Sequence, residues 1–124
     1  MTLFQPGHAA AFRLLLAIAL AITSWQTMTP SPMPLPLDHG DKLAHAGTFL
    51  LLAFLVDSGW PAHPIGWRAF SLLALYGAGI EIAQHFVSNR SMSAADLLAD
   101  LTGLAFYALL IGPWLRRHQV RNRQ

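Results

Sequence analysis

The sequence lacks cysteine altogether and has few charged residues. Among its 124 residues there is no cysteine, and only 11% are Asp, Glu, Lys or Arg, whereas 54% are hydrophobic. The missing cysteines exclude a disulfide framework and any thiolate metal site. The low charge content is far from that of a soluble domain, and no stretch is polar enough to form one. Together with a mean hydropathy of +0.42, this composition is typical of an integral membrane protein.

Basic residues gather at the C-terminus. Half of the eight Lys and Arg residues are Arg116, Arg117, Arg121 and Arg123, so the high sequence pI of about 9.7 owes much to one short segment. An anionic membrane surface accounts for such a segment without nucleic acid. We therefore expect membrane lipids as partners, and no nucleic acid.

Four apolar runs predict transmembrane helices. About 20 apolar residues cross a hydrocarbon core of ~30 Å at 1.5 Å per residue. Ser93 precedes the last run as an N-cap, and Gly112 with Pro113 is expected to close it. The sequence therefore predicts an all-α polytopic membrane protein, a bundle of four transmembrane helices in one domain spanning residues 1–124. The predicted helices lie at about 9–29, 41–57, 67–87 and 94–114, followed by a basic cytoplasmic tail at 115–124.

Two segments have a second interpretation. The run at 9–29 also resembles a secretory signal peptide, because Arg13 precedes an apolar core and small residues at 19–21 resemble a cleavage site. Its length and the interfacial residue Trp25 favour a retained helix. The alternating prolines at 30–36 exclude a helix and predict an extended segment. That segment is either a stiff spacer or a strap over the outer face of the bundle.

The distribution of basic residues orients the predicted bundle. With four helices, both termini and the loop at 58–66 share one side, which has six of the eight basic residues. The other side has only Lys42 and Arg90. Because cytoplasmic loops are enriched in Lys and Arg, we predict that both termini are cytoplasmic. Cleavage of the first helix would leave the remaining topology unchanged.

Polar residues interrupt the apolar runs near the predicted outer surface. Alternating helix direction brings the start of the second helix, the end of the third and the start of the fourth to one depth. Residues three or four apart on a helix share a face, so each helix presents its polar residues from one side. The predicted network consists of Asp41, Lys42, His45, Glu81, Gln84, Arg90, Asp96 and Asp100.

Glu81 and Asp100 are the hardest of these residues to explain by local structure, because neither caps a helix. Each is predicted to lie roughly 9 Å below the outer boundary, and we expect the two to face each other. An unpaired charge at such a depth is costly. Asp96 has a simpler explanation as a capping pair with Ser93, and Lys42 can extend to the interface.

Small residues accompany the network and predict close helix packing. They recur at four-residue steps as Gly79 and Ala83, and again as Ala95, Ala99 and Gly103. Small side chains let helix backbones approach in membranes.

The charges of the network suggest what it binds. Arg90 and Lys42 suit a phosphate on a lipid head group, and the neighbouring carboxylates suit Mg²⁺ shared with that phosphate. The network can also compensate its own charges. The sequence has no serine elbow, zinc-protease motif or Gly-rich phosphate loop, so it assigns neither catalytic residues nor metal ligands. A divalent cation stays open as a cofactor.

The ordered set of polar residues resembles the VanZ-like family of small bacterial integral membrane proteins. The matching patterns are D-K-x-x-H-x-x-x-F at Asp41, Lys42, His45 and Phe49, G-x-E-x-x-Q at Gly79, Glu81 and Gln84, and then Arg90, Ser93, Asp96 and Gly103. Asp100 departs from the family, which more often has asparagine there. The resemblance implies a multi-pass inner-membrane protein of the cell envelope, in a family whose founding member is linked to glycopeptide (teicoplanin) resistance. It implies no reaction.

Three functions fit these residues. We prefer an outer-leaflet pocket in which Arg90, Lys42 and His45 contact the phosphate of an anionic lipid or polyprenyl-phosphate head group. The alternatives are an intramembrane enzyme that uses Glu81 or His45 as acid-base on an envelope lipid, and a passive scaffold in which the network only fixes helix packing. The sequence determines neither the ligand nor the oligomeric state. A homo-oligomer stays open as a partner.

Overall fold

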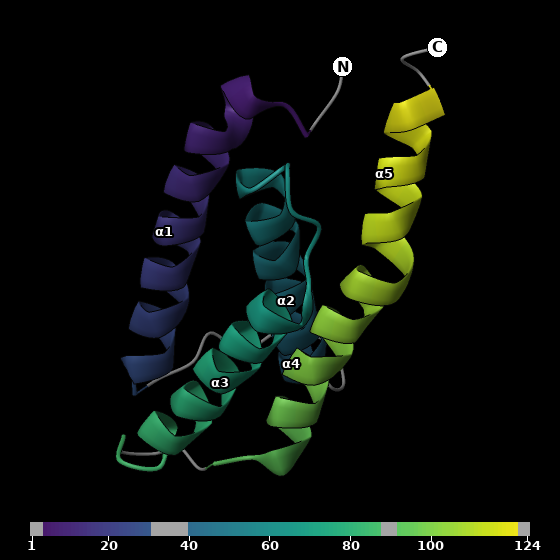
Figure 1. Cartoon of the computed structure of the whole chain (residues 1–124). Helices are drawn as coiled ribbons and strands as arrows, with labels where there is room; N and C mark the ends of the chain where they lie inside the picture. Colours follow the sequence, from purple (N-terminus) through teal and green to yellow (C-terminus); the bar gives the residue numbers. More distant parts are fainter. Residues whose placement is uncertain (1–3, 31–39, 88–91, 122–124) are drawn as a thin grey trace.

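The chain folds into helices. The computed structural model describes residues 4–30, 40–87 and 92–121, and every regular element in these ranges is helical. The elements are α1 (Pro6–Met28), α2 (Gly40–Gly59), α3 (Trp67–Gln84), α4 (Ala94–Phe106), the π-helical turn η1 (Tyr107–Ile111) and α5 (Gly112–Arg121). In Figure 1, α4, η1 and α5 form one continuous rod beside α1, α2 and α3. The predicted all-α fold is confirmed.

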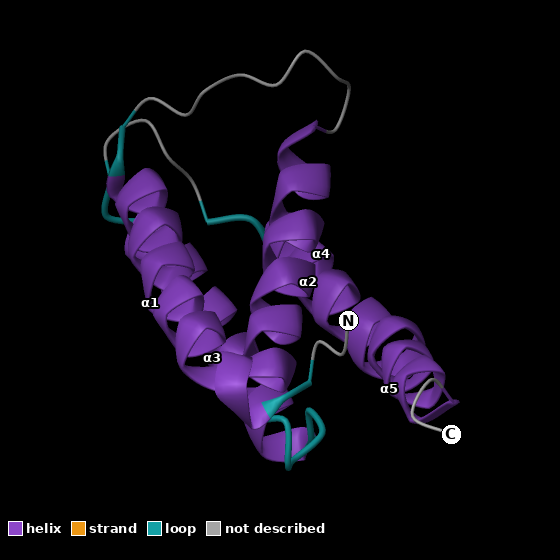
Figure 2. Ribbon diagram, turned by 90° about the horizontal axis from the view of Figure 1, so that it is seen from above, coloured by secondary structure: helices purple, strands orange, loops and turns teal. Residues whose placement is uncertain are grey.

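The helices run alternately between two ends of the bundle. The start of α1, the loop between α2 and α3, and the end of α5 lie at one end, which we call the terminal end (Figure 1). The end of α1, the start of α2, the end of α3 and the start of α4 lie at the other, which we call the distal end. Figure 2 shows the same arrangement from above. The predicted network therefore belongs to the distal end.

Helix α2 is the centre of the bundle, since it packs against α1, α3 and, most extensively, α4. Phe49 and Leu52 of α2 are buried together with Leu104 and Tyr107 of the α4–η1 rod. A Cβ atom at Gly103 would overlap the backbone carbonyl of Ala46. Glycine at position 103 therefore permits the close α2–α4 approach, as predicted.

Gly79 does not serve such a packing role, and that prediction is wrong. Apart from the adjoining backbone of α3, no atom of the described residues lies within 4 Å of the place where its Cβ would be. Gly77 makes the close contact on α3 instead, because a Cβ there would lie 3.0 Å from Asp100 Oδ2 and 3.1 Å from the ring of Phe49. The α3 backbone thus comes close to both side chains at this point.

The last helix does not close at Gly112 and Pro113, contrary to the prediction. Proline lacks an N–H, and its ring clashes with the carbonyl four residues earlier in an α-helix. The π turn η1 widens the helix at this place, and the Gly112 N–H donates to the Tyr107 carbonyl. Such single turns accommodate a helix irregularity without ending the helix. The segment predicted as a tail is consequently helical through Arg121; the other helix bounds agree within three residues.

Two of the helical rods are long and apolar enough to cross a membrane: α1 and the continuous rod from Ala94 to Arg121. Helices α2 and α3 contain most of the predicted network, and those polar residues lower their hydropathy. The assignment of four spans therefore stays a prediction. The alternating prolines at 31–36 and Arg90 lie outside the described residues.

Candidate functional site at the distal end

His45 of α2 is held between two carboxylates of α4. Its Nδ1 lies 2.8 Å from Oδ1 of Asp100, and its Nε2 lies 3.9 Å from Oδ2 of Asp96. An ionised carboxylate only accepts hydrogen bonds, so Nδ1 donates to Asp100. That bond fixes the ring and turns Nε2 toward Asp96.

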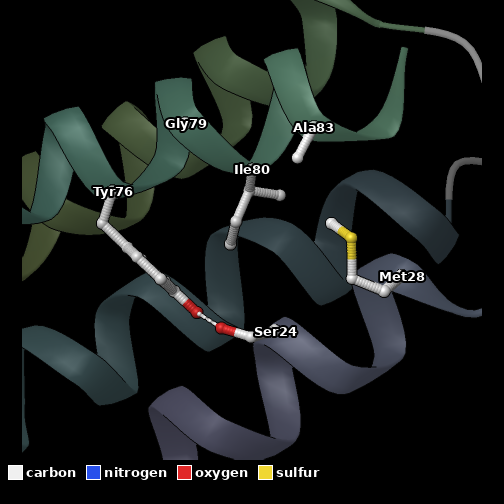
Figure 3. A pocket seen from close by; sticks show the side chains of 6 residues that line it. All are labelled: Ser24, Met28, Tyr76, Gly79, Ile80 and Ala83. Carbon is white, nitrogen blue, oxygen red and sulfur yellow. Dashed lines mark hydrogen bonds between the residues drawn. The ribbon is translucent and has the colours of Figure 1, made fainter. Parts of the chain in front are cut away.

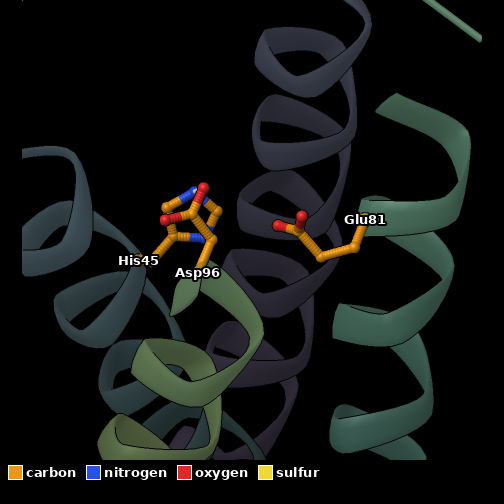
Figure 4. A group of neighbouring side chains, drawn as sticks. All are labelled: His45, Glu81 and Asp96. Carbon is orange, nitrogen blue, oxygen red and sulfur yellow. Dashed lines mark ion pairs between the residues drawn. The ribbon is translucent and has the colours of Figure 1, made fainter. Parts of the chain in front are cut away.

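Glu81 of α3 completes this group (Figure 4). One nitrogen of His45 and one oxygen each of Glu81 and Asp96 lie within 4.8 Å of one another. In Figure 4, the Glu81 side chain extends from α3 toward the other two. Three helices, α2, α3 and α4, thus direct potential metal-ligating atoms at one point.

The start of α4 is fixed by a bond from another helix. Ser93 is the N-cap, as predicted, and its hydroxyl accepts from the Asp96 N–H at 3.2 Å. In a capping box the side chain of Asp96 would accept from the Ser93 N–H in return. Here Oε2 of Glu81 accepts that bond at 2.9 Å. Glu81 therefore joins α3 to α4, and the Asp96 carboxylate faces the cluster.

Lys42 lies at the rim of the cluster. Its Nζ is 3.0 Å from Oδ2 of Asp41 and 3.4 Å from Oδ1 of Asp96. The Asp41 side chain is 61% exposed, so it belongs to the surface and not to the buried part of the network. Exposed pairs of this kind contribute little to stability.

Asp100 is the most buried residue of the site, with a side chain of 0% exposure. Its Oδ1 bonds to His45, whereas its Oδ2 has no hydrogen-bond partner among the described residues. Oδ2 instead lies near the Gly77 backbone. A buried carboxylate is ordinarily bonded through both oxygens, and within the described ranges this one is bonded through Oδ1 alone.

The cluster is acidic overall within the described part of the chain. The carboxylates of Glu81, Asp96 and Asp100 lie around one histidine, which can be neutral or charged. The lysine at the rim is shared between Asp96 and the exposed Asp41. Uncompensated charge in a low-dielectric interior is costly. The site is therefore suited to a cation, or to an anion that brings a cation with it.

Five of the eight predicted residues meet in the cluster: Lys42, His45, Glu81, Asp96 and Asp100. Asp41 stays at its exposed edge. Gln84 is buried at the end of α3, and Arg90 is outside the described residues. The contact that the structure gives Asp100 is with His45, where the sequence predicted Glu81.

A second polar cluster, at the terminal end, was not predicted from the sequence. Asp57 is fully buried and pairs with Arg116 of α5. Tyr107 donates to its Oδ2 at 2.9 Å, and the Ile65 N–H donates to its Oδ1 at 2.8 Å. The sequence predicted that Arg116 belongs to a basic cytoplasmic tail. The available signal was Asp57 itself, since a carboxylate in an apolar run needs a partner.

An apolar groove lies between α1 and α3 at the distal end (Figure 3). It encloses about 260 Å³ and is lined by Ser24, Met28, Tyr76, Gly79, Ile80 and Ala83. Its one polar feature in Figure 3 is the hydrogen bond between Ser24 and Tyr76, at 2.8 Å. Its described lining residues are all uncharged and include none from the acidic cluster.

Comparison of the chain with protein-family models, curated proteins and solved structures finds no match. The likeness to the VanZ-like family rests on the ordered residues of the sequence alone.

Proposed function

We propose that the chain is a VanZ-like, multi-pass protein of the bacterial inner membrane, with four transmembrane helices and both termini in the cytoplasm. The exposed surface supports this topology. Large apolar side chains are exposed on all four rods, including Ile18, Leu51, Leu75 and Leu109. Exposed apolar surface of this extent suits contact with lipid.

The tryptophans support the same topology. All four are exposed. Trp25, Trp60 and Trp67 lie near helix ends, and Trp114 lies at the start of α5, within the continuous rod. Tryptophan is enriched at both membrane interfaces. In the proposed orientation, Trp25 lies at the outer interface and the other three at the inner one.

The proposed activity is binding of the phosphate of an anionic lipid or polyprenyl-phosphate head group in the outer leaflet. The observation that supports it most is the placement of two donors, Lys42 and His45, by carboxylates at the distal end. Both side chains are partly exposed, so a head group can reach them from the interface. Arg90, predicted from the sequence, would add a third donor with bidentate geometry.

The remaining residues position these donors. Asp100 orients His45, and Glu81 fixes Ser93 at the start of α4, close in sequence to Arg90. The apolar groove, at the same end of the bundle, offers space for the hydrocarbon chain of the bound lipid. A head group in the cluster and a chain in the groove would account for both features.

Native mass spectrometry of the protein released in mild detergent tests this proposal. We expect a copurified phospholipid or polyprenyl phosphate on the wild type, and at least a tenfold loss in Lys42→Gln and Arg90→Glu. Arg68→Gln is the matched control, because Arg68 is exposed on α3 at the terminal end. Equal lipid content in all four proteins would refute head-group binding at the distal end.

The groove has its own test. Gly79→Leu adds a side chain where no atom lies within 4 Å of the new Cβ, so it fills the groove without a backbone clash. We expect this variant to fold and to lose copurified lipid. Retention of the wild-type lipid content would exclude the groove as the site of the hydrocarbon chain.

A second candidate function is an intramembrane enzyme that acts on an envelope lipid. The Asp100–His45 hydrogen bond favours it, because a carboxylate that fixes an imidazole is a recurrent arrangement for general acid-base catalysis. Purified protein incubated with labelled envelope lipids, with and without a chelator, tests it. Absence of conversion across a broad lipid panel would contradict catalysis and leave binding as the function.

A further inference from the structure

The acidic cluster has the composition and geometry of a metal site. We propose that His45, Glu81 and Asp96 bind one divalent transition cation of the Zn²⁺ or Mn²⁺ type, with Asp100 as the residue that positions His45. The inference rests on the proposed function only for its last ligand, the phosphate oxygen of the bound head group.

The spacing of the three side chains suits one ion. Three atoms within 4.8 Å of one another can all lie within roughly 2.8 Å of a common point. Bonds to Zn²⁺ from histidine nitrogen or carboxylate oxygen are about 2.0–2.2 Å long. An inward movement of roughly 0.6–0.8 Å per atom, within the reach of side-chain rotation, therefore completes the coordination.

The choice of metal follows from the donor set. One imidazole and two carboxylates suit zinc or manganese better than calcium or magnesium, which prefer oxygen alone. Three protein ligands leave a coordination position for an outside group, as in catalytic zinc sites. In the proposed complex, the lipid phosphate occupies that position, and its bond to the ion takes the place of a direct hydrogen bond from His45, because a ligating Nε2 carries no proton.

Asp100 supplies the second, independent indication. Histidines that bind metals commonly donate the other ring N–H to a carboxylate, which fixes the tautomer and raises the basicity of the ligating nitrogen. Nδ1 of His45 makes this bond to Asp100, and Nε2 is thereby directed at Asp96. The second oxygen of Asp100 is buried and lacks a partner within the described ranges, so its charge is not balanced by hydrogen bonds there.

The cation also offsets the negative charge of the cluster. Among the described residues, the three carboxylates of the cluster and the exposed Asp41 outnumber the one lysine, and this negative excess repels a bare phosphate. A dication held by His45, Glu81 and Asp96 reverses this repulsion. Head-group phosphate and metal then bind cooperatively, each raising the affinity for the other by the same factor.

Calorimetric titration of the delipidated, chelator-stripped protein with Zn²⁺ and Mn²⁺ tests the site itself. We expect one ion per chain. The variants His45→Ala, Glu81→Gln and Asp96→Asn should each lose at least tenfold in affinity. Asp100→Asn should lose about 10- to 100-fold, as carboxylates behind ligating histidines do. His85→Ala is the matched control, since His85 is exposed at the same end of α3.

Two further readouts separate coordination from folding. Co²⁺ in place of Zn²⁺ should give visible absorption bands in the wild type and in His85→Ala, and these should be absent from His45→Ala. Circular dichroism checks that each variant keeps its helix content, and Zn²⁺ should raise the unfolding temperature of the wild type but not of Glu81→Gln. Wild-type protein that binds no ion, or ligand variants that bind as the wild type does, would overturn the proposal.

Lipid content measured with and without chelator distinguishes this proposal from the preceding one. Metal binding by a delipidated protein that never recovers lipid would support the metal site and refute head-group binding. Lipid binding that survives complete chelation, with no ion bound by the wild type, would support head-group binding and refute the metal site.

Discussion

Two of the buried carboxylates of the bundle, Asp57 at the terminal end and Asp100 at the distal end, differ in how completely they are bonded. Oδ1 of Asp57 accepts from Arg116 and the Ile65 N–H, and its Oδ2 accepts from Tyr107 and Arg116. Among the residues that the structure describes, Asp100 has one partner, His45, on one oxygen. A carboxylate whose two oxygens are both hydrogen-bonded within the fold stabilises the structure. A carboxylate with one unbonded oxygen can still interact with a ligand.

The terminal cluster should be the more sensitive of the two to loss of a partner. Arg116→Ala leaves the Asp57 carboxylate buried without its cation, and breaking a buried pair in this way costs about 3–5 kcal/mol. Unfolding by SDS titration in detergent micelles, followed by circular dichroism, measures the loss. The neighbouring Arg117 is exposed, so Arg117→Ala should change stability by less than about 0.5 kcal/mol. Equal effects of the two variants would remove the distinction between the clusters.

The helix contact that supports the distal cluster is the next most sensitive feature. Gly103→Ala drives a methyl group into the Ala46 carbonyl, and forced separation of packed elements typically costs about 1–3 kcal/mol. Gly79→Ala meets no atom and should stabilise the helix by about 0.5–1 kcal/mol. Thermal unfolding of the two proteins in the same detergent compares them. A stabilising Gly103→Ala substitution would contradict the close α2–α4 approach.

The N-cap of α4 should contribute a smaller amount. Ser93→Ala removes the acceptor for the Asp96 N–H but keeps the backbone N–H that bonds to Glu81, so the expected loss is about 1 kcal/mol. Thr102→Ala is a suitable control, because the Thr102 hydroxyl is exposed and bonds only within its own helix. Amide hydrogen exchange in the first turn of α4 should accelerate in Ser93→Ala alone. Unchanged exchange there would show that Glu81 by itself fixes the start of the helix.

The smallest change in stability should follow Asp100→Asn. Asparagine keeps an acceptor for His45 and removes a buried charge, so stability should change by less than about 1 kcal/mol in either direction. Asp57→Asn should cost several times more, since it leaves Arg116 without its carboxylate. SDS unfolding of both variants gives the comparison. If Asp100→Asn proves as destabilising as Asp57→Asn, the distal cluster is a packing device and the passive scaffold is the better description.

Local signals in the sequence were sufficient for most of the fold. Apolar runs long enough to span a membrane predicted the four helical rods. Ser93 predicted the start of α4, because N-capping depends only on neighbouring residues. The end of the last helix was wrong for the opposite reason. Gly112 and Pro113 favour termination locally, but burial of Tyr107 and pairing of Arg116 with Asp57 belong to tertiary structure.

The sequence predicted the level of the site residues along the bundle axis, but not which side chains contact each other. Alternating helix direction placed His45, Glu81 and Asp96 at one level, as the structure has them. Which side chains meet depends on the rotation of each helix about its axis, and the sequence pattern does not determine that rotation closely. The rotation of α2 against α4 is set by contacts such as Gly103 with Ala46. For this reason the partner of Asp100 is His45, and the link from Glu81 to Ser93 could not be foreseen.

The π turn at Tyr107–Ile111 also has an angular consequence. In a regular helix of 3.6 residues per turn, two residues nine positions apart point in roughly opposite directions, about 180° around the axis. Tyr107 and Arg116 stand in that relation. The wider turn between them delays the rotation, which brings their directions to roughly a quarter turn from each other. Because the π turn contains one added residue, Tyr107 and Arg116 of the same rod both bond to the carboxylate of Asp57.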